Sequence, residues 1–157
     1  MPRPLPVKVE YRVGVQAPPE LIWSFVADIR SWPSWNPLYP KAEGEVQFGA
    51  ELTLEEAFPG QAPRTIHPKV QDWTPNEQII WTQSAFGGLL RSTRYIEIEK
   101  LSDAGVIFSN GELYEGPLRH LINRRRRRIL KSGFRSMCEA VRDKAEAAFN
   151  RPAPGAT

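Results

Sequence analysis

Three side chains capable of acid–base or hydrogen-bonding chemistry fall at positions that the sequence pattern groups with apolar residues. Arg94 shares the strand phase of Ile96, and so both side chains are expected on one face. Glu112 and Tyr114 share one phase of the next strand-like segment; because both of its phases contain apolar residues, their direction stays open. If they point inward they meet Arg94, and buried charges of opposite sign can pair there. Such a group could orient a carbonyl and move protons, or it could be an ion pair with a structural role alone.

A run of five arginines, Arg124–Arg128, lies in a segment whose apolar spacing predicts a helix. Successive helical residues are about 100° apart, so five of them cover about 400° and cannot share one solvent face. Arg126 falls in the apolar stripe with Ile129, where a buried guanidinium would need an acidic partner or an anionic ligand; Arg125 takes this place if the helix bends. Alternatively, the aliphatic part of the Arg126 side chain packs against the core while its guanidinium reaches water. The other members are expected in solvent, where they could weakly contact an anionic membrane or a polyanion: Arg124, Arg127 and Arg128.

The basic residues are concentrated in one part of the chain. The net charge is +3, but eight Lys and Arg and no acid lie from Arg119 to Arg135, so the rest of the chain is net negative. Clustered arginines suit phosphates. Because the remaining sequence is acidic and offers no basic and aromatic platform on which bases could stack, no specific nucleic acid is expected as a partner.

Other familiar catalytic and metal-binding arrangements are not evident. No serine has a convincing His and Asp context, and no glycine-rich phosphate loop precedes a helix. One cysteine, Cys138, and two histidines, His67 and His120, cannot form a conventional closed zinc site. We therefore predict no metal ion and no cofactor, a core position for Cys138, and surface or capping roles for both histidines, with His120 the better of the two for acid–base work.

Length and composition predict one soluble globular domain. The 157 residues are 41% hydrophobic, which fits a single core. No apolar stretch approaches the roughly 20 residues of a membrane-spanning helix, the start lacks the apolar core of a signal peptide, and a lone cysteine fits a reducing compartment, so a cytoplasmic location is expected. Residues 1–6 and 151–157 are expected to be flexible tails around a domain of residues 7–150.

Alternation and helical spacing predict the elements that would position these residues. Residues 9–15 alternate as in a half-buried strand. Pro18-Pro19-Glu20 opens a helix that ends before Pro33, within the aromatic corner Trp32-Pro33-Ser34-Trp35-Asn36-Pro37, which suits a pocket floor or mouth. From Leu118 to about Phe149 there is no proline, and one long helix is predicted. Between these parts, short turns separate six strand-like segments of an antiparallel meander: 41–48, 51–58, 65–73, 78–86, 91–101 and 105–115.

Several short motifs accompany this order of elements: 17–23 (APPELIW), 35–37 (WNP), 65–70 (TIHPKV), Trp81, 112–116 (ELYEG) and 134–144. With these motifs, the order of elements resembles the START-like or SRPBCC superfamily, in particular its bacterial polyketide cyclase/dehydrase-like branch. The resemblance implies an α+β helix-grip fold: a curved seven-stranded antiparallel sheet wrapped around a long C-terminal helix, with short helices between strands 1 and 2 and a cavity inside. Its members bind lipids, sterols, polyketides and other hydrophobic molecules, and only some are enzymes. Many relatives carry another polar residue, often histidine, at the place of Arg94, so histidine chemistry is not carried over.

Successive turns of a meander alternate between its two ends, so residues 36–40, 58–63, 86–90 and 115–117 should share one end, which is expected to hold the cavity mouth. Phe86-Gly87-Gly88-Leu89-Leu90 places apolar side chains on a glycine-hinged loop, as in a lid; the alternative is a hairpin whose leucines fold back onto the core. The residues predicted to contact a ligand are Trp35, Tyr39, Trp81, Phe86, Leu89, Leu90, Arg94, Ile96, Phe108, Glu112, Tyr114, Arg126 and Ile129.

Three functions follow as hypotheses. The leading one is binding of a hydrophobic small molecule of lipid, polyketide or aromatic type, with an anionic head group as one option, in the cavity between sheet and helix. The alternative is a polyketide cyclase or dehydratase, a lyase or isomerase in type, that uses Arg94, Glu112, Tyr114 and Arg126; the sequence shows no catalytic constellation for it. The third is an interaction protein whose arginine-rich helix contacts anionic membrane or nucleic acid.

Overall fold

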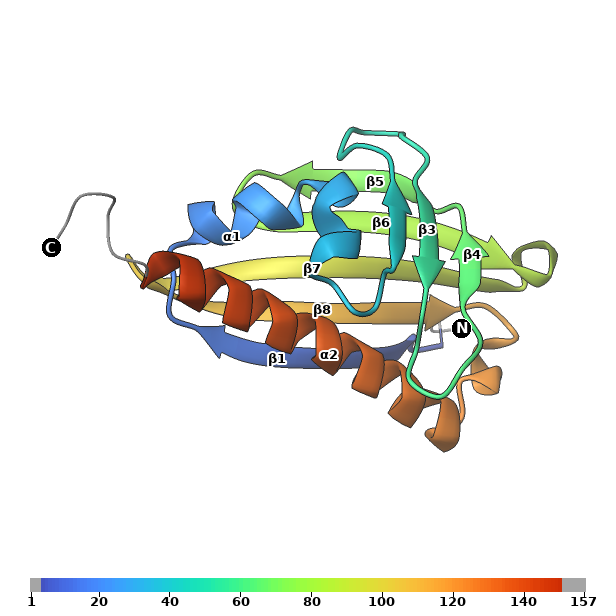
Figure 1. Cartoon of the computed structure of the whole chain (residues 1–157). Coiled ribbons are helices and arrows are strands. Elements are labelled where there is room, and N and C mark those ends of the chain that lie inside the picture. The colour runs from blue at the N-terminus through green and yellow to red at the C-terminus, as the bar shows by residue number, and fades with distance from the viewer. Residues whose placement is uncertain (1–3, 151–157) are drawn as a thin grey trace, which may run out of the picture.

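The computed structural model describes residues 4–150 and shows the α+β helix-grip architecture (Figure 1). One antiparallel sheet has five strands in the order β1 (Val7–Val15), β8 (Gly105–Glu115), β7 (Leu90–Ser102), β6 (Gln78–Ala85) and β5 (Lys69–Thr74). A second sheet has three strands in the order β2 (Lys41–Glu43), β3 (Thr53–Glu56) and β4 (Arg64–Ile66). The helices are α1 (Pro19–Val26) and α2 (Arg124–Phe149), with short 3-10 helices at Ile29–Ser34, Phe86–Gly88 and Arg119–Leu121.

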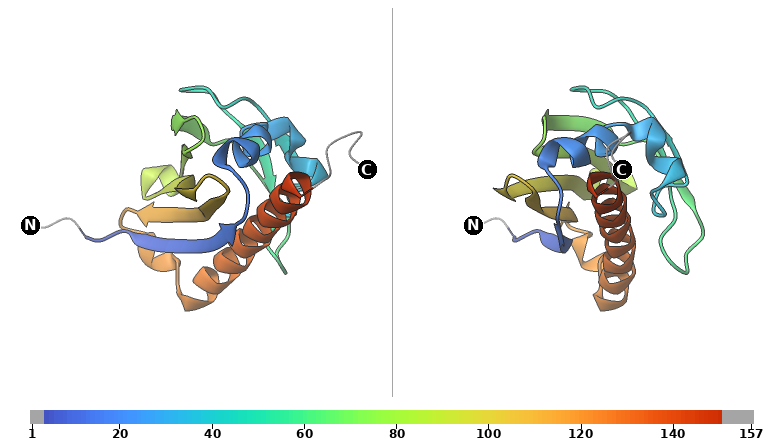
Figure 2. Two further views of the ribbon diagram at one scale, coloured as in Figure 1. Left: turned by 90° about the vertical axis from the view of Figure 1, so that its left-hand side faces the viewer. Right: turned by 60° about the vertical axis from the view of Figure 1, so that its left-hand side comes forward.

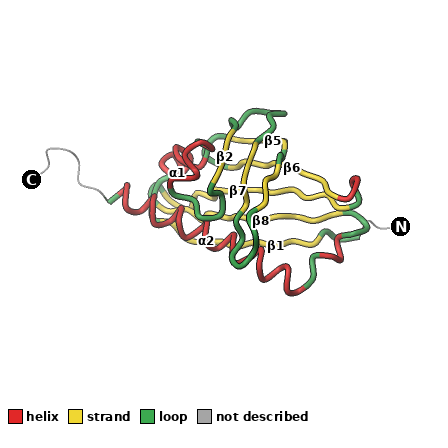
Figure 3. The backbone as a smooth tube through the Cα atoms, turned by 45° about the vertical axis from the view of Figure 1, so that its right-hand side comes forward, coloured by secondary structure: helices red, strands yellow, loops and turns green. Residues whose placement is uncertain are grey.

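The long helix and the small sheet lie on the same side of the large sheet. Figure 2 shows the five strands as one layer, with α2 and the small sheet opposite it. The strands of the small sheet run across those of the large one (Figure 3). Their shared interior is the core, which contains the buried face of α2: Leu130, Gly133, Phe134, Met137, Cys138, Val141 and Ala145.

The structure has eight strands where the sequence predicts seven. The predicted strand at 65–73 is two strands, because β4 ends at Ile66 and β5 begins at Lys69. Pro68 between them has no N–H to donate to a sheet ladder. Its carbonyl accepts instead from the backbone N–H of Leu52, at 2.8 Å, and this contact ties the two sheets together.

The long helix begins six residues later than predicted. The region from Leu118 contains a short 3-10 turn, and α2 starts only at Arg124. Asn123 is the N-cap, and its side-chain oxygen accepts from the backbone N–H of Arg126 at 2.9 Å, which is the contact that commonly fixes a helix start. The arginine run therefore forms the first turns of α2.

The aromatic corner lies partly in the core, through Trp32, and partly at the surface, where Pro33 lines a hollow beside the small sheet. The helix α1 ends at Val26, before Pro33 as predicted, and a separate 3-10 helix then runs through Pro33. Trp32 is completely buried, and its indole N–H donates to the Val26 carbonyl at 3.0 Å. Trp35 packs edge-on against Phe25, with ring centroids 5.2 Å apart.

The two tails are described only in small part. Residues 4–6 form neither helix nor strand, while the tail segments 1–3 and 151–157 lie outside the described residues. Within the described chain, no helix is both long and apolar enough to cross a lipid bilayer.

Candidate functional site

Three predicted site residues form a cross-strand row inside the fold. In the strand register Glu112 pairs with Arg94, and Arg94 pairs with Trp81. All three are almost inaccessible to solvent. The Arg94 guanidinium lies 4.3 Å from the centre of the Phe134 ring on α2, so the row faces the helix. The sequence leaves open which way the side chains of Glu112 and Tyr114 point from β8, and in the structure both point inward.

Arg94 is held by neutral groups. Its guanidinium donates to the Asn110 side-chain oxygen, to the Gly111 carbonyl at 3.1 Å and to the Tyr39 hydroxyl at 3.1 Å. Asn110 in turn donates to the Phe134 carbonyl on α2 at 3.3 Å. A buried charge needs such a set of partners to remain charged. The register of β7 and β8 supplies two of them.

The carboxylate of Glu56 is linked to Arg94 through the hydroxyl of Tyr39. The Tyr39 hydroxyl donates to Glu56 at 3.2 Å, and Arg64 lies 3.4 Å from the other oxygen of that carboxylate. Burial raises the pKa of Tyr39, so this hydroxyl keeps its proton. Glu56 is only 4% exposed, whereas the Arg64 side chain is 61% exposed. A polar path thus leads from the surface to Arg94.

Glu112 is a buried carboxyl whose pKa lies near neutral pH. Burial, followed by the negative charge of Glu56, raises the pKa of Glu112 to about 7. The Tyr114 hydroxyl donates to Glu112 Oε1 at 2.5 Å, and burial and the charge of Glu112 raise the pKa of Tyr114, so Tyr114 stays protonated. Glu112 can therefore take up and release a proton, while the hydrogen bond from Tyr114 holds the Glu112 carboxyl in place.

Each member of the row keeps one buried polar atom without a partner within residues 4–150: Trp81 Nε1, Arg94 Nε and Glu112 Oε2. An unpaired buried donor or acceptor costs about 1–3 kcal/mol, and natural proteins keep few of them. Two donors and one acceptor thus lie next to each other on three neighbouring strands. This is the arrangement that a bound polar group would satisfy.

Phe58 closes one end of this interior. Its ring lies edge-on to Phe134, with centroids 5.9 Å apart, and the Arg126 guanidinium lies 5.9 Å from the centre of the Phe58 ring. The ring occupies the space above Gly133, where a β-carbon would collide with it. Trp81, Ile96 and Phe108, which the sequence predicts to line a cavity, are completely buried, so no water-sized space adjoins them in the described structure.

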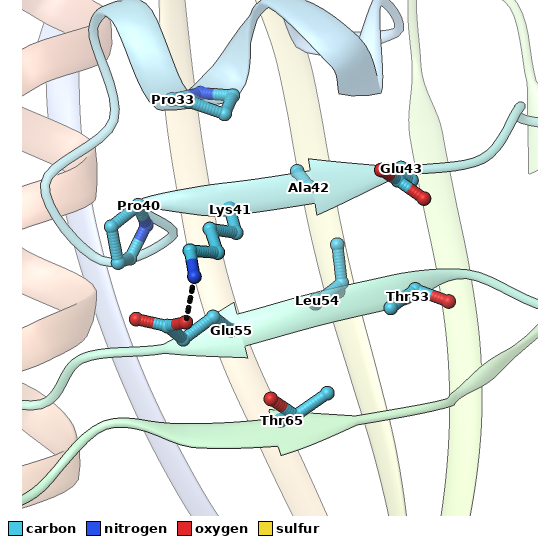
Figure 4. A pocket seen from close by; sticks show the side chains of 9 residues that line it. All are labelled: Pro33, Pro40, Lys41, Ala42, Glu43, Thr53, Leu54, Glu55 and Thr65. Carbon is cyan, nitrogen blue, oxygen red and sulfur yellow. Dashed lines mark ion pairs between the residues drawn. The ribbon is translucent and has the colours of Figure 1, made fainter.

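Two hollows on the surface of the described residues lie away from the row. One of about 350 Å³ lies beside β2 and β3, where Lys41 and Glu55 form an ion pair at 3.6 Å (Figure 4). The other, about 560 Å³, lies between the start of α1 and the β6 and β7 strands near Glu77 and Glu97. Neither contains a residue of the internal polar group. Among residues 4–150, no three His, Cys, Asp or Glu side chains are grouped so that they could hold a metal ion.

A family model described as polyketide cyclase / dehydrase and lipid transport matches residues 6–149. The chain belongs to this family. A comparison with curated protein sequences gives no match.

Solved structures share the fold of this polyketide cyclase/dehydrase family member at low sequence identity. The Zhui aromatase/cyclase from Streptomyces sp. R1128 has a TM-score of 0.76 and 18% identity, over 96% of this chain and 99% of that one. A START superfamily protein from Mycobacterium smegmatis has a TM-score of 0.72 and 19% identity, over 90% and 98%. Norcoclaurine synthase from Thalictrum flavum, solved with dopamine and hydroxybenzaldehyde, has a TM-score of 0.67 and 14% identity, over 95% and 90%.

The structure brings about half of the predicted site residues together. The interior group contains Tyr39, Trp81, Arg94, Ile96, Phe108, Glu112 and Tyr114. The others lie outside it. Phe86 and Leu89 are 61% and 49% exposed, as in the predicted lid. Leu90 is half-buried against the core, as in the predicted alternative of a hairpin that folds back. The remaining three are half-buried: Trp35, Arg126 and Ile129.

Four residues at the site are absent from the predicted set: Glu56, Phe58, Asn110 and Phe134. A signal was present for the first two, since Leu52, Leu54, Glu56 and Phe58 alternate with polar or small residues and are all buried. Period-two spacing would have given all four one inward phase. In the arginine run, Arg124, Arg127 and Arg128 are exposed, as expected from the sequence. Arg126 is half-buried and lies outside the interior group, so its contact with a ligand stays a prediction.

Proposed function

We propose that this family member binds a small hydrophobic molecule between the large sheet and α2, with Trp81, Arg94 and Glu112 as its polar contacts. The observation that carries the proposal is the row of unpartnered atoms on these three residues. The N–H groups of Trp81 and Arg94 suit carbonyl or phenol oxygens, and Glu112 suits a hydroxyl donor. The aromatic rings around the row, Tyr39 and Phe134 among them, suit a flat apolar body.

The spacing of the row favours an oxygen-rich ligand over a simple lipid. Neighbouring strands lie about 4.8 Å apart, so the three polar contacts are spread over about 10 Å. A polyketide or a flavonoid carries oxygens at several places along a rigid frame, whereas a fatty acid carries them only at its head. An anionic head group would lie best near Arg126, at the Phe58 end.

Entry of the ligand requires Phe58 to leave its place above Gly133. Phe58 lies in the connection between β3 and β4, and connections move more readily than the strands they join. The fold around the row would stay as it is, because Arg94 is tied to Tyr39 and Asn110. Lipid ligands, a bacterial origin and a cytoplasmic location stay predictions from the sequence.

The binding proposal is tested with conservative tryptophan variants. Trp81→Phe keeps an aromatic side chain but replaces the indole with a smaller phenyl ring and removes the unpartnered N–H, while Trp73→Phe makes the same change at a partly exposed ring that stacks on Trp23. A flavonoid that displaces a naphthalene sulfonate dye should bind Trp81→Phe about 2- to 10-fold more weakly, the loss of one hydrogen bond. It should bind Trp73→Phe as it binds the wild type. Equal affinities for both variants, or no displacement from the wild type, would contradict the proposal.

A second candidate function, dehydration of a β-hydroxy ketone, is favoured by the raised pKa of Glu112 and by its free oxygen. The Glu112 carboxylate would take the proton from the carbon beside the ketone while Arg94 stabilises the enolate oxygen. The protonated carboxyl would then return this proton to the β-hydroxyl, which leaves as water and forms the carbon–carbon double bond. Glu112→Gln should abolish the formation of the conjugated ketone, followed by its ultraviolet absorbance, and should retain dye binding. Unchanged turnover in this variant would exclude the mechanism.

A further inference from the structure

Three large apolar side chains are exposed at the end of the molecule where α2 begins. Phe86, Leu89 and Leu121 are 61%, 49% and 43% exposed. They lie on two segments that are joined directly, because the Leu118 N–H donates to the Leu89 carbonyl at 3.1 Å. Gly116 allows this approach, since a β-carbon there would collide with the same carbonyl. The β6–β7 tip and the start of α2 lie on the same side of the molecule in Figures 1 and 3.

The same end carries the arginine run. Arg124, Arg125, Arg127 and Arg128 are exposed on the first turns of α2. Arg127 also donates to the Ile122 carbonyl at 3.2 Å, one residue from Leu121. Within residues 4–150, none of the five arginines of the run forms an ion pair with an acidic side chain. Apolar side chains and unpaired guanidinium groups thus share one surface.

The position of the run works against helix stability. The N-terminal end of a helix carries partial positive charge and favours acidic side chains, but the first turn of α2 contains no acid. Like charges three and four residues apart repel each other, as Arg124 does with Arg127 and Arg128. Helix stability therefore does not explain the run, and a negatively charged partner does.

We propose that this end of the molecule, defined by Phe86, Leu89, Leu121 and the run Arg124–Arg128, docks on an anionic phospholipid bilayer. The three apolar side chains would enter the boundary between headgroups and acyl chains. The arginines would lie at the level of the phosphates, which guanidinium groups bind in a bidentate manner. A nucleic acid offers the charge but no apolar layer for the two leucines. The proposal rests on this surface alone and not on the internal ligand site.

The test is sedimentation of the full chain with vesicles of phosphatidylglycerol and phosphatidylcholine in about equal amounts, against vesicles of phosphatidylcholine alone. The wild type should bind the anionic vesicles, and added salt should weaken binding. Each basic residue at an anionic surface is worth about fivefold in affinity, so replacing four of them should weaken binding at least about 100-fold. The charge variant is Arg124→Gln, Arg125→Gln, Arg127→Gln and Arg128→Gln. The apolar variant, Leu89→Ser with Leu121→Ser, should weaken binding by about 10-fold or more.

Matched controls remove the same groups elsewhere on the surface. Phe48→Ser with Leu101→Ser removes two side chains that are 79% and 64% exposed, and it should bind as the wild type does. The charge control is Arg30→Gln, Lys41→Gln, Lys69→Gln and Lys100→Gln. Equal losses in control and test variants would overturn the proposal, as would failure of the wild type to bind anionic vesicles. It would also be overturned if single-stranded DNA bound as tightly as vesicles and the apolar variant bound vesicles as tightly as the wild type, because the partner would then be a polyanion.

Discussion

Glu112→Gln should reverse a pH-dependent loss of stability that the buried carboxyl imposes on the fold. The pKa of Glu112 is raised from 4.5 to about 7, first by burial and then by the charge of Glu56. Between these two pH values the native protein holds a proton that the unfolded chain has released. Stability is therefore fully present below about pH 4.5, falls as the pH rises toward 7, and stays at its lower value above.

The size of this effect follows from the width of the pH window. One pKa unit corresponds to about 1.4 kcal/mol, so the shift of Glu112 corresponds to roughly 3 kcal/mol over the whole range. Between about pH 5 and about pH 8 the expected change is about 2.5 kcal/mol, because the unfolded carboxyl is already largely ionised at the lower value. Glutamine has nearly the same shape, can accept from the Tyr114 hydroxyl and carries no charge, so it removes the titration alone.

The assay is urea unfolding of the wild type and Glu112→Gln at these two pH values. The free energy of unfolding of the variant, relative to the wild type, should be greater by about 2.5 kcal/mol at the higher pH. Glu97→Gln is the control, because Glu97 lies on the outer, exposed face of β7, and its difference from the wild type should stay constant. If the Glu112→Gln and wild-type curves ran parallel, Glu112 would not be a buried carboxyl that is neutral at low pH, and the reasoning would be refuted.

Further predictions concern packing. Phe58→Ala should lower the free energy of unfolding by about 3 kcal/mol and yet increase the affinity for a naphthalene sulfonate dye, because it opens the interior. Gly133→Ala should also increase the dye affinity, since its β-carbon displaces the Phe58 ring. Unchanged dye affinity in both variants would contradict the idea that Phe58 closes the interior. Gly111→Ala should lower the free energy of unfolding by more than about 2 kcal/mol, because the Tyr95 hydroxyl fills the space for a β-carbon. Gly14→Ala, where nothing lies nearby, should cost less than Gly111→Ala, and equal costs would show that the packing is misjudged.

Strand periodicity predicted the central chemistry of the site. The phase shared by Arg94 and Ile96 placed the guanidinium inward, and the phase of Glu112 and Tyr114 allowed the same for the carboxyl. Both are observed, because alternation in a sheet with one buried face leaves little freedom for the register. The breaks at Pro68 and Asn123 were not predicted, although a residue with no N–H and a residue typical of helix caps stand at these positions.

The partners that come from other elements could not be predicted in the same way. Glu56 and Phe58 are brought to Arg94 and Gly133 by the crossing of the small sheet over the large one, which no local pattern encodes. That the interior is filled rather than hollow could not be predicted from a local pattern either. Whether a ring or a space lies above Gly133 depends on how a connection folds back, and that is decided by tertiary packing.

The most direct test of the proposed binding site is the indole N–H spectrum of the uniformly ¹⁵N-labelled protein during titration with a flavonoid. Five tryptophans give five indole signals, and Trp81→Phe identifies the one from the row. The unpartnered Trp81 N–H should gain an acceptor, so its proton signal should move downfield and saturate with the ligand, while the signal of the partly exposed Trp73 stays in place. Saturable binding that moves only surface indoles such as Trp73, and leaves Trp81 unchanged, would contradict a ligand site between the sheet and α2.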